Sequence, residues 1–398
     1  MKKLLAIVLA ALMIVPVLAA CQPSNNNGNA DSTYKVAMIT DYGDITDESF
    51  NQTTYEACKE YCDANNVPFR YYKPASDSTP ERVAKVEEAI DAGYNIIVMP
   101  GFAFAGTIYD VQDKPEYKDI KFIALDVSQW DVEDCFYNHD ASGARTDLID
   151  PNNKAHIKDN VYCAVYQEEL CGYMAGYAAV KLGYKHLGFL GGMAVPAVIR
   201  YGYGFVQGCD AAAVEMGIAD QVSVEYVYGN KFSGDPAIAA YMDTWYKTKG
   251  VEVVFACGGG IYTSAVEAAK KANGKVIGVD VDQAATIKTL SGVDDMTVTS
   301  AMKGLAATVK NVLNETIKNN NWSKFGTKVE NLGLVSGTDP ELNYVQIPMK
   351  STQWGDGFTQ ENYKELVNKM FTGEIKVSNA IDAMPSTTIA VSEQGNIL

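Results

Sequence analysis

The chain has 398 residues, with 33 lysines and arginines against 49 aspartates and glutamates, so its formal net charge is −16. Apolar residues make up 47% and charged residues 21%, a balance typical of a folded globular protein that argues against wholesale disorder. The acidic balance leaves no basic footprint, which argues against binding to nucleic acid or to an anionic membrane surface. The length predicts two domains, each able to bury its own core.

The N-terminal segment predicts export. Lys2 and Lys3 precede an apolar run over residues 4–20 that is too short, and too broken by a proline, to span a bilayer well but is typical of a secretory signal. The run ends in Leu18-Ala19-Ala20-Cys21, which resembles a bacterial lipobox whose cysteine thiol receives the lipid. A plain signal peptide with an incidental cysteine is the alternative. We expect residues 1–20 to be a lipoprotein signal peptide and Cys21 to be lipidated.

A polar, asparagine-rich stretch follows, so residues 21–33 are expected to hold the lipidated cysteine and a flexible linker. A lipid anchor with a slack tether would place the folded part on the extracytoplasmic face of the cell membrane. The anchor would be its only contact with the membrane.

The other seven cysteines are an odd number, which cannot form a closed set of disulfides. No CxxC occurs, and none of the three histidines lies near a cysteine pair with zinc spacing, so no metal site is expected. Cys58 and Cys62 lie four residues apart on an expected helix. They are expected to be buried small hydrophobic side chains rather than a redox pair.

Short β-rich runs alternate with helical patterns from Tyr34 onward, which predicts an α/β fold with parallel sheets covered on both faces. Two such sets form two doubly wound lobes. The expected strands are Lys35–Thr40, Phe69–Tyr72, Ile96–Met99, Lys121–Leu125, Val161–Val165, Leu187–Leu190, Val222–Tyr226, Val251–Ala256 and Val276–Val279. The expected helices are Phe50–Ala64, Pro80–Ala92, Glu169–Leu182, Ile199–Met216, Pro236–Lys247 and Tyr262–Ala272.

Carboxylates and glycines follow several of these strands. Asp41, Asp126 and Asp280 each come at the end of an expected strand, and the run Gly258–Gly260 follows another. In doubly wound sheets ligands bind beyond the carboxyl ends of the strands, so these residues are candidates for a binding site. A single aspartate at such a place can equally be a helix cap.

Motifs for several common chemistries are absent. No GxxxxGK[ST], HExxH or GxSxG is found, and no nucleophile pairs with a histidine. Gly202, Gly204 and Gly208 nearly spell a dinucleotide fingerprint, but they fall inside an expected helix and are interpreted as packing glycines. We therefore expect no catalytic residues, no cofactor and no enzymatic activity, although acid–base chemistry by two carboxylates stays an alternative.

The segment TDYGDITDESFNQ, from Thr40 to Gln52, resembles the signature of the basic membrane protein (BMP) family, the purine nucleoside receptor lipoproteins that serve ABC importers. The similarity spans roughly Tyr34 to Lys376. Further matching blocks follow in the same order: Gly101–Thr107, Glu168-Glu169 through Gly176-Tyr177, Gly188–Met193 with Pro196 and Arg200, Gly278–Gln283, Thr299–Lys303 and Gly357-Phe358-Thr359.

The resemblance implies two lobes joined by a hinge, the type I periplasmic-binding-protein fold. The expected first lobe comprises residues 34–160 plus 286–330, and the second 161–285 plus 331–398. Crossings between the lobes are expected near residues 160, 285 and 330.

The resemblance also implies roles for single residues. Phe50 would stack on the purine, with Asn51 and Asp41 hydrogen-bonding near it and Asp126 lining the base pocket. Stacking on an aromatic side chain contributes roughly 1–3 kcal/mol per base. The bland alternative for Phe50 is a core aromatic residue.

At the ribose, the resemblance implies that Asp280 accepts the hydroxyls with Lys303 nearby. One carboxylate can accept both donors of a cis-diol as charge-assisted bonds. Burying that carboxylate would be costly unless an opposite charge such as Lys303 paired with it. A helix cap and a solvated lysine are the alternatives.

For the second stacking ring we rank Tyr201 before Phe232 and Tyr262. The backbone N–H groups of Gly258 and Gly260 would approach the sugar closely, or the run would simply be the turn into the next helix. Tyr42 and Asp44 stand where relatives have small residues. Adenosine, guanosine and inosine therefore cannot be ranked.

The expected function is an extracytoplasmic solute-binding lipoprotein that captures a purine nucleoside between two lobes and delivers it to ABC permease subunits. The alternative within this class is a receptor for a monosaccharide or another small polar solute. A nucleoside-cleaving hydrolase and a ligand-sensing partner of a membrane receptor are the alternatives from other classes.

Overall fold

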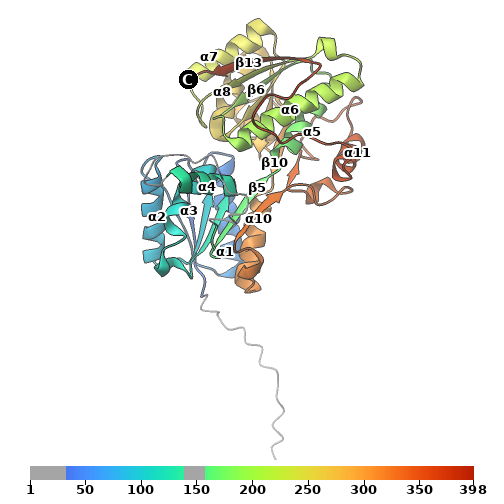
Figure 1. Ribbon diagram of the computed structural model, residues 1–398. Helices are drawn as coiled ribbons and strands as arrows, with labels where there is room; N and C mark the ends of the chain where they lie inside the picture. Colours follow the sequence, from blue (N-terminus) through green and yellow to red (C-terminus); the bar gives the residue numbers. More distant parts are fainter. Residues whose placement is uncertain (1–32, 139–156) are drawn as a thin grey trace, which may run out of the picture. The chain divides into compact units, whose positions relative to one another are not determined.

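Two β-sheets carry the fold, and each is covered by helices (Figure 1). The computed structural model describes residues 33–138 and 157–398. The strands of the first sheet, in spatial order, are β11 (Lys328–Leu332), β5 (Val161–Tyr166), β4 (Lys121–Leu125), β3 (Ile96–Pro100), β1 (Val36–Ile39) and β2 (Phe69–Tyr72). Those of the second sheet are β12 (Val345–Gln346), β10 (Thr297–Lys303), β9 (Lys275–Asp280), β8 (Val253–Cys257), β6 (His186–Gly191), β7 (Ser223–Tyr228) and β13 (Ala390–Asn396).

Both sheets repeat one strand order. In each, the strand that comes first along the chain (β1 or β6) lies between the second and the third, and the fourth and fifth follow outward. This is a doubly wound order, with the strands of each set of five parallel. Of the three added strands, β11 and β13 are parallel to their neighbours and β12 is antiparallel to β10. The expected fold class is confirmed.

Helices lie on both faces of each sheet, and with them each sheet makes one lobe (Figure 1). The helices of the first lobe are α1 (Phe50–Asn65), α2 (Thr79–Asp91), α3 (Ala105–Val111), α4 (Gln129–Asn138) and α10 (Leu305–Leu313). Those of the second lobe are α5 (Glu168–Lys181), α6 (Pro196–Glu215), α7 (Pro236–Thr244), α8 (Tyr262–Ala272), α9 (Ala284–Ser291) and α11 (Gln360–Phe371).

Successive strand residues point to opposite faces, so each strand contributes to two cores. In β1, Val36 and Met38 join the core beneath α1 and α10, whereas Ala37 and Ile39 join the one beneath α2, α3 and α4. Because both faces are buried, the strands are apolar without alternation, as the sequence predicts. Every expected strand and helix is present, with ends shifted by a few residues.

The chain crosses between the sheets after β5, β10 and β11. The first two crossings therefore differ from those expected near residues 160 and 285, because Val161–Tyr166 pairs with β4 in the first sheet and Thr297–Lys303 pairs with β9 in the second. The third, after Leu332, lies close to residue 330. A fully apolar strand does not reveal from its sequence which sheet it joins.

The expected signal peptide, Cys21 and nearly all of the linker lie outside the described residues. Among the helices that the structure describes, none combines the length and the apolar character needed to cross a membrane. The seven described cysteines are free thiols, and Cys58 and Cys62 on α1 are completely buried, as expected.

Glycines bring α5 and α6 into direct backbone contact. A Cβ atom at Gly204 would lie 2.1 Å from the carbonyl oxygen of Glu169, and one at Gly208 would lie 2.1 Å from that of Tyr173. A Cβ at Gly202 would lie 2.2 Å from the hydroxyl of Tyr226. The packing role of these glycines is confirmed.

We predict that Gly208→Ala lowers the stability of the protein by about 1–3 kcal/mol, because the added methyl group must push two helices apart. This loss outweighs the gain of up to about 1 kcal/mol that alanine brings to a helix interior. The midpoint of thermal unfolding measures it. Gly355→Ala is the control, since its Cβ would lie 3.7 Å from Leu182. An unchanged midpoint for Gly208→Ala would contradict the packing role.

Candidate functional site

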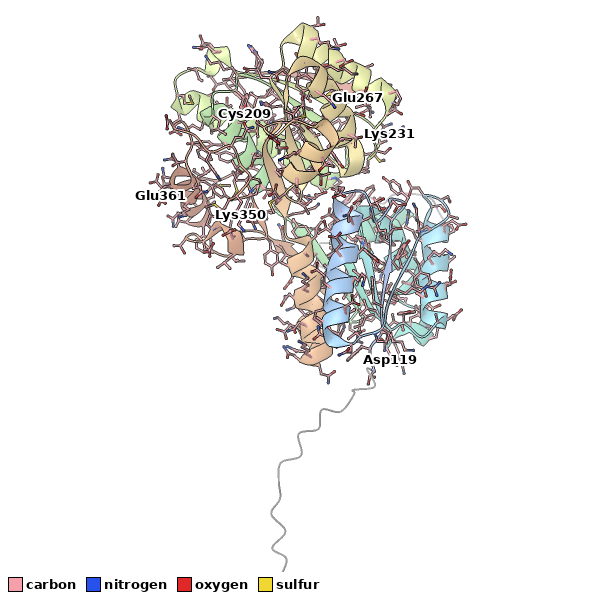
Figure 2. The ribbon with its side chains drawn as sticks, turned by 180° about the vertical axis from the view of Figure 1, so that it is seen from behind. Asp119, Cys209, Lys231, Glu267, Lys350 and Glu361 are labelled. Atoms are coloured by element: carbon pink, nitrogen blue, oxygen red, sulfur yellow. The ribbon has the colours of Figure 1, made fainter. Side chains whose placement is uncertain are left out.

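A cavity of about 740 Å³ lies between the two lobes, at the carboxyl ends of their strands. Figure 2 shows Lys231, one of its lining residues, on the side of the second lobe that faces the first. All nine residues expected at a binding site line this cavity: Asp41, Phe50, Asn51, Asp126, Tyr201, Gly258, Gly260, Asp280 and Lys303.

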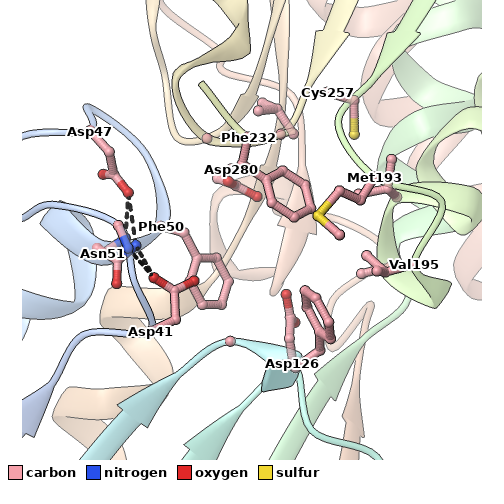
Figure 3. A pocket seen from close by; sticks show the side chains of 18 of the residues that line it. Asp41, Asp47, Phe50, Asn51, Asp126, Met193, Val195, Phe232, Cys257 and Asp280 are labelled. Carbon is pink, nitrogen blue, oxygen red and sulfur yellow. Dashed lines mark hydrogen bonds between the residues drawn. The ribbon is translucent and has the colours of Figure 1, made fainter. Parts of the chain in front are cut away.

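On the first lobe, Asp41 and Asn51 form a fixed polar corner (Figure 3). Oδ1 of Asp41 accepts hydrogen bonds from the backbone N–H groups of Tyr42 and Gly43, both at 2.6 Å, and from the Asn51 amide at 3.2 Å. The same amide donates to Asp47 at 3.1 Å. Both Asn51 N–H donors are thus used, and its buried Oδ1 has no partner among the described residues.

Phe50 is the first residue of α1, and its ring lies in the cavity (Figure 3). The preceding residue, Ser49, donates a hydrogen bond of 2.5 Å to Oδ2 of Asp280 on the other lobe. The Lys303 ammonium lies 4.6 Å from the centre of the Phe50 ring and 3.6 Å from Asp280. The aromatic ring and the carboxylate therefore meet in one space.

Asp126 and Asp280 occupy matching places at the ends of β4 and β9, the fourth strands of their sheets. Both have left-handed backbones, with φ of 59° and 64°. Such a conformation costs of order 1–3 kcal/mol in a residue other than glycine and concentrates at functional sites. The left-handed backbone sets the direction in which each carboxylate leaves its strand.

Glycines repeat in the same way after the third strands. Gly101 follows β3 with φ of 121°, and Gly258 follows β8 with φ of 139°. A Cβ at Gly101 would lie 3.2 Å from the Asp41 carboxylate, and one at Gly258 would lie 2.7 Å from the Phe232 ring. Each glycine leaves room for a cavity side chain.

Lys303 is the electrostatic centre of the cavity, and its side chain is 3% exposed. Its ammonium donates to Asp126 at 2.5 Å and lies 3.6 Å from Asp280 and 3.7 Å from Glu168. Burial opposes the charge, but the three carboxylates together raise the pKa of Lys303 above its ordinary value. The lysine is therefore charged at any physiological pH.

Burial raises the pKa of Asp126 to about 6, with Lys303 opposing the shift and Glu168 and Asp280 adding to it. Asp126 is therefore mainly ionised at neutral pH and takes up a proton as the pH falls through about 6. Its buried Oδ1 has no hydrogen-bond partner among the described residues.

The ring contributed by the second lobe differs from the first expectation. Tyr201 is 1% exposed, makes a T-shaped contact with Phe255, and lies with its hydroxyl 3.5 Å from Asp280. The Lys303 ammonium lies 5.6 Å from the centre of its ring. Phe232, which was ranked lower, points into the cavity beside Met193 (Figure 3).

The glycine run leads directly into α8, which agrees with the second of its two expected roles. The Gly260 N–H donates to the carbonyl of Phe232 at 2.8 Å, so it does not face a sugar. A Cβ at Gly192 would lie 2.3 Å from the Phe232 ring, and one at Gly258 would lie 2.7 Å from the same ring. These glycines seat the Phe232 segment, a reason that only the tertiary contacts reveal.

Side chains of the two lobes meet around the cavity. The Tyr42 hydroxyl lies 3.8 Å from the Met193 sulfur, and the rings of Phe102 and Phe232 are 6.4 Å apart. On another side, the Gln283 amide donates to the carbonyl of Glu48 at 3.0 Å. The structure is thus one in which the two lobes touch across the cavity.

Sequence reasoning missed the second cation of the site. Arg200 lines the cavity and donates at 2.7 Å to Glu168, which is fully buried on α5. The signal was present, because Glu168 and Arg200 stand in two of the blocks that match the BMP family. No role could be given to them without their contact.

Two doubly wound lobes with polar groups from both facing one cavity define the class of solute-binding proteins that bind between lobes. The family model described as "ABC transporter substrate-binding protein PnrA-like" matches residues 34–338. The chain belongs to this family, the basic membrane protein family, whose members bind a solute for an ABC transporter and are not enzymes.

Known proteins give a consistent picture. The chain is 26% identical to the ABC transporter nucleoside-binding protein BmpA of Lactococcus lactis, over 79% of this chain and 85% of that one. It is 25% identical to basic membrane protein B of Borreliella afzelii, over 81% and 84%. A solute-binding protein of an ABC transporter system from Aeropyrum pernix superposes with a TM-score of 0.65 at 18% identity, covering 88% of this chain and 94% of that one. The fold is the type I periplasmic-binding-protein fold.

Glu169, the residue after Glu168 on α5, is expected to make the stability of the protein depend on pH. Its carboxyl is buried, and burial raises its pKa to about 7, with the charge of Glu168 adding to the shift while its own backbone N–H and Arg200 oppose it. Because its ordinary pKa is 4.5, the folded protein holds this proton more tightly than the unfolded chain. The stabilisation is complete below about pH 4.5 and is lost as the pH rises through about 7.

We expect Glu169→Gln to melt at the same temperature as the wild type at pH 5 and at a higher temperature at pH 8. The gain is on the order of 2–3 kcal/mol, because the variant buries no charge. Glu361→Gln, whose side chain is 74% exposed, is the control and is expected to show no such gap. A gap that stays constant with pH would mean that Glu169 is not the group that titrates.

Proposed function

We propose that the protein captures a purine nucleoside between its two lobes and delivers it to the permease of an ABC importer. The observation that carries the proposal is the meeting of Phe50 with Asp280 in one cavity, beside a buried Lys303. A nucleoside needs a surface for a flat base and an acceptor for a diol, and this cavity offers both. The name of the Lactococcus lactis relative supports the same ligand class.

The base is held between Phe50 of the first lobe and Phe232 of the second. Both rings line the cavity from opposite lobes, and Phe232 replaces Tyr201 as the proposed second ring because its side chain points into the cavity, whereas Tyr201 is 1% exposed. Each stacking contact contributes roughly 1–3 kcal/mol and tolerates any purine.

The ribose hydroxyls donate to Asp280. An ionised carboxylate offers about four acceptor positions, and Ser49 and Tyr201 occupy only part of them. Hydrogen bonds to a carboxylate are about twice as strong as neutral ones, and the Lys303 ammonium lies 3.6 Å from this buried carboxylate.

Acceptors dominate the remaining polar groups. The unpartnered oxygens of Asn51 and Asp126 are available to N–H donors on the edge of a base. The three cations that line the cavity are each paired among the described residues, Lys303 with Asp126, Arg200 with Glu168 and Lys231 with Asp235. This pairing favours an uncharged ligand over a phosphorylated one.

The Leu18–Cys21 motif and the membrane-protein relative support a lipid anchor at Cys21 on the extracytoplasmic face of the cell membrane. Anchored in this way, the receptor would stay beside its permease. Closure of the lobes would present a joint surface to that permease.

A thermal-shift panel with adenosine, guanosine, inosine and several monosaccharides tests the proposal. A nucleoside at about a thousand times its Kd is expected to add roughly 4 kcal/mol of stability. A shift with a monosaccharide and none with any nucleoside would contradict it. Release of free base from inosine would instead indicate a hydrolase.

We predict that Asp280→Asn weakens inosine binding about ten- to hundredfold, because a hydrogen bond to a charged group is worth about 1.5–3 kcal/mol. The loss should be much smaller for 2′,3′-dideoxyinosine, which lacks the diol. Calorimetric titration of both ligands gives the ratio. Asp282→Asn, which removes a carboxylate bonded to Ser351 outside the cavity, is the control. Equal losses for the two ligands would contradict the ribose assignment.

Phe50→Ala and Phe232→Ala should each weaken adenosine, guanosine and inosine alike, by roughly five- to hundredfold. Phe371→Ala, at a ring that is 48% exposed at the end of α11, should leave all three affinities unchanged. Selective loss of a single purine in either cavity variant would show that the ring does more than stack.

A further inference from the structure

Glu168 is a buried carboxylate placed at a crossing between the lobes. It is the first residue of α5, two residues after β5 ends in the first sheet, and its side chain is 0% exposed. A buried charge costs several kcal/mol unless it is paired and hydrogen-bonded. The contacts of Glu168 therefore indicate what it does.

Glu168 contacts Arg200 and Lys303, two cations that line the cavity, without lining the cavity itself. Its Oε2 accepts from Nε of Arg200 at 2.7 Å, and its Oε1 lies 3.7 Å from the ammonium of Lys303. Arg200 and Lys303 line the cavity, whereas Glu168 does not. Through these two side chains Glu168 contacts residues that line the cavity.

Glu168 also holds an unused acceptor. Its Oε1 is buried without a hydrogen bond among the described residues, because Lys303 donates to Asp126 instead. Lys303 therefore has one acceptor in front of it, on the first lobe, and a second behind it, on α5. A ligand donor that engages the unpartnered Oδ1 of Asp126 would share this carboxylate with Lys303, which bonds to Oδ2. The ammonium then has a second acceptor, Oε1 of Glu168, 3.7 Å away.

We propose that Glu168 is a positioning residue of the binding site, which fixes Arg200 and accepts Lys303 when a ligand donor engages Asp126. The identity of the ligand in this inference rests on the proposed function, but the contacts do not. Ligand binding is then an exchange of carboxylate partners by one buried lysine, and the ammonium stays beside a carboxylate throughout.

The charged and titratable groups around Glu168 come from seven elements. They are Lys303 at the end of β10, Arg200 and Tyr201 on α6, Asp126 at the end of β4, Asp280 at the end of β9, Tyr166 at the end of β5, Cys257 at the end of β8, and Glu169 and Cys171 on α5. The charge of Glu168 is among the leading causes that raise the pKa of Asp126, and that of Glu169 is not. Glu169→Gln is therefore a matched control on the same helix.

The experiment compares wild type, Glu168→Gln and Glu169→Gln in two measurements. Without ligand, ¹³C NMR titration of the aspartate carboxyls, with Asp126 assigned through Asp126→Asn, gives the Asp126 pKa. With inosine, calorimetric titration between pH 5 and pH 8 gives affinity against pH. In the wild type we expect Asp126 to titrate near 6 and binding to weaken below that pH, as the carboxylate is lost.

In Glu168→Gln the pKa of Asp126 should fall, because a neighbouring negative charge is removed, and the loss of binding at acid pH should begin at a lower pH. The affinity at pH 7.5 should drop about ten- to hundredfold, as is usual when a residue that orients a ligand-contacting group is removed. Glu169→Gln should match the wild type in both measurements. Loss of affinity with an unchanged Asp126 pKa and pH profile would indicate a merely structural role and overturn the inference. An unchanged affinity would also overturn it.

Glu168→Asp keeps the negative charge on a side chain that is shorter by one methylene. It is used in place of Glu168→Gln if that variant does not fold. It should retain a raised Asp126 pKa but lose affinity, because the shorter side chain no longer reaches both cations; full affinity would overturn the inference. If wild-type protein binds no nucleoside in the panel, the proposed function fails. The ligand-free titration then decides the link between Glu168 and Asp126 on its own.

Discussion

The structure depends on one buried ammonium group held by carboxylates that come from both lobes. Lys303 bonds to Asp126 of the first lobe and lies near Asp280 and Glu168 of the second. Neither set of charges would be tolerable alone, because a buried ion without a partner costs several kcal/mol. The lobes thus supply each other's counter-charges, and the place where they do so is the cavity. A polar ligand enters a space whose electrostatics are already arranged for it.

The two lobes position their cavity residues with the same two backbone conformations. In each lobe a glycine with positive φ follows the third strand, and a left-handed aspartate ends the fourth strand. Gly101 makes room for Asp41, while Gly258 makes room for Phe232. Two similar halves therefore contribute different chemistry, a polar corner from one and a ring from the other, to a single site.

The contacts around the cavity fit a receptor that binds by closing. Tyr42 meets Met193, Phe102 approaches Phe232, and Glu48 bonds to Gln283, so that both lobes touch on more than one side of the cavity. Three crossings of the chain connect the lobes, and Glu168 and Lys303 lie at two of them. Residues that line the cavity and residues that join the lobes are therefore neighbours, so the shape of the cavity depends on the relative position of the lobes.

The sequence by itself determined the doubly wound architecture, because apolar strands and amphipathic helices alternate in a pattern that only covered parallel sheets satisfy. It also determined the family and nine residues that line one cavity, since strand ends gather at one edge of each sheet. Only the tertiary structure decided the lobe to which Val161–Tyr166 belongs, the burial of Tyr201 while Phe232 points into the cavity, and the hydrogen bond of the Gly260 N–H to Phe232. These depend on contacts between residues far apart in the chain, such as Glu168 with Arg200. The local pattern of residue types does not predict such contacts.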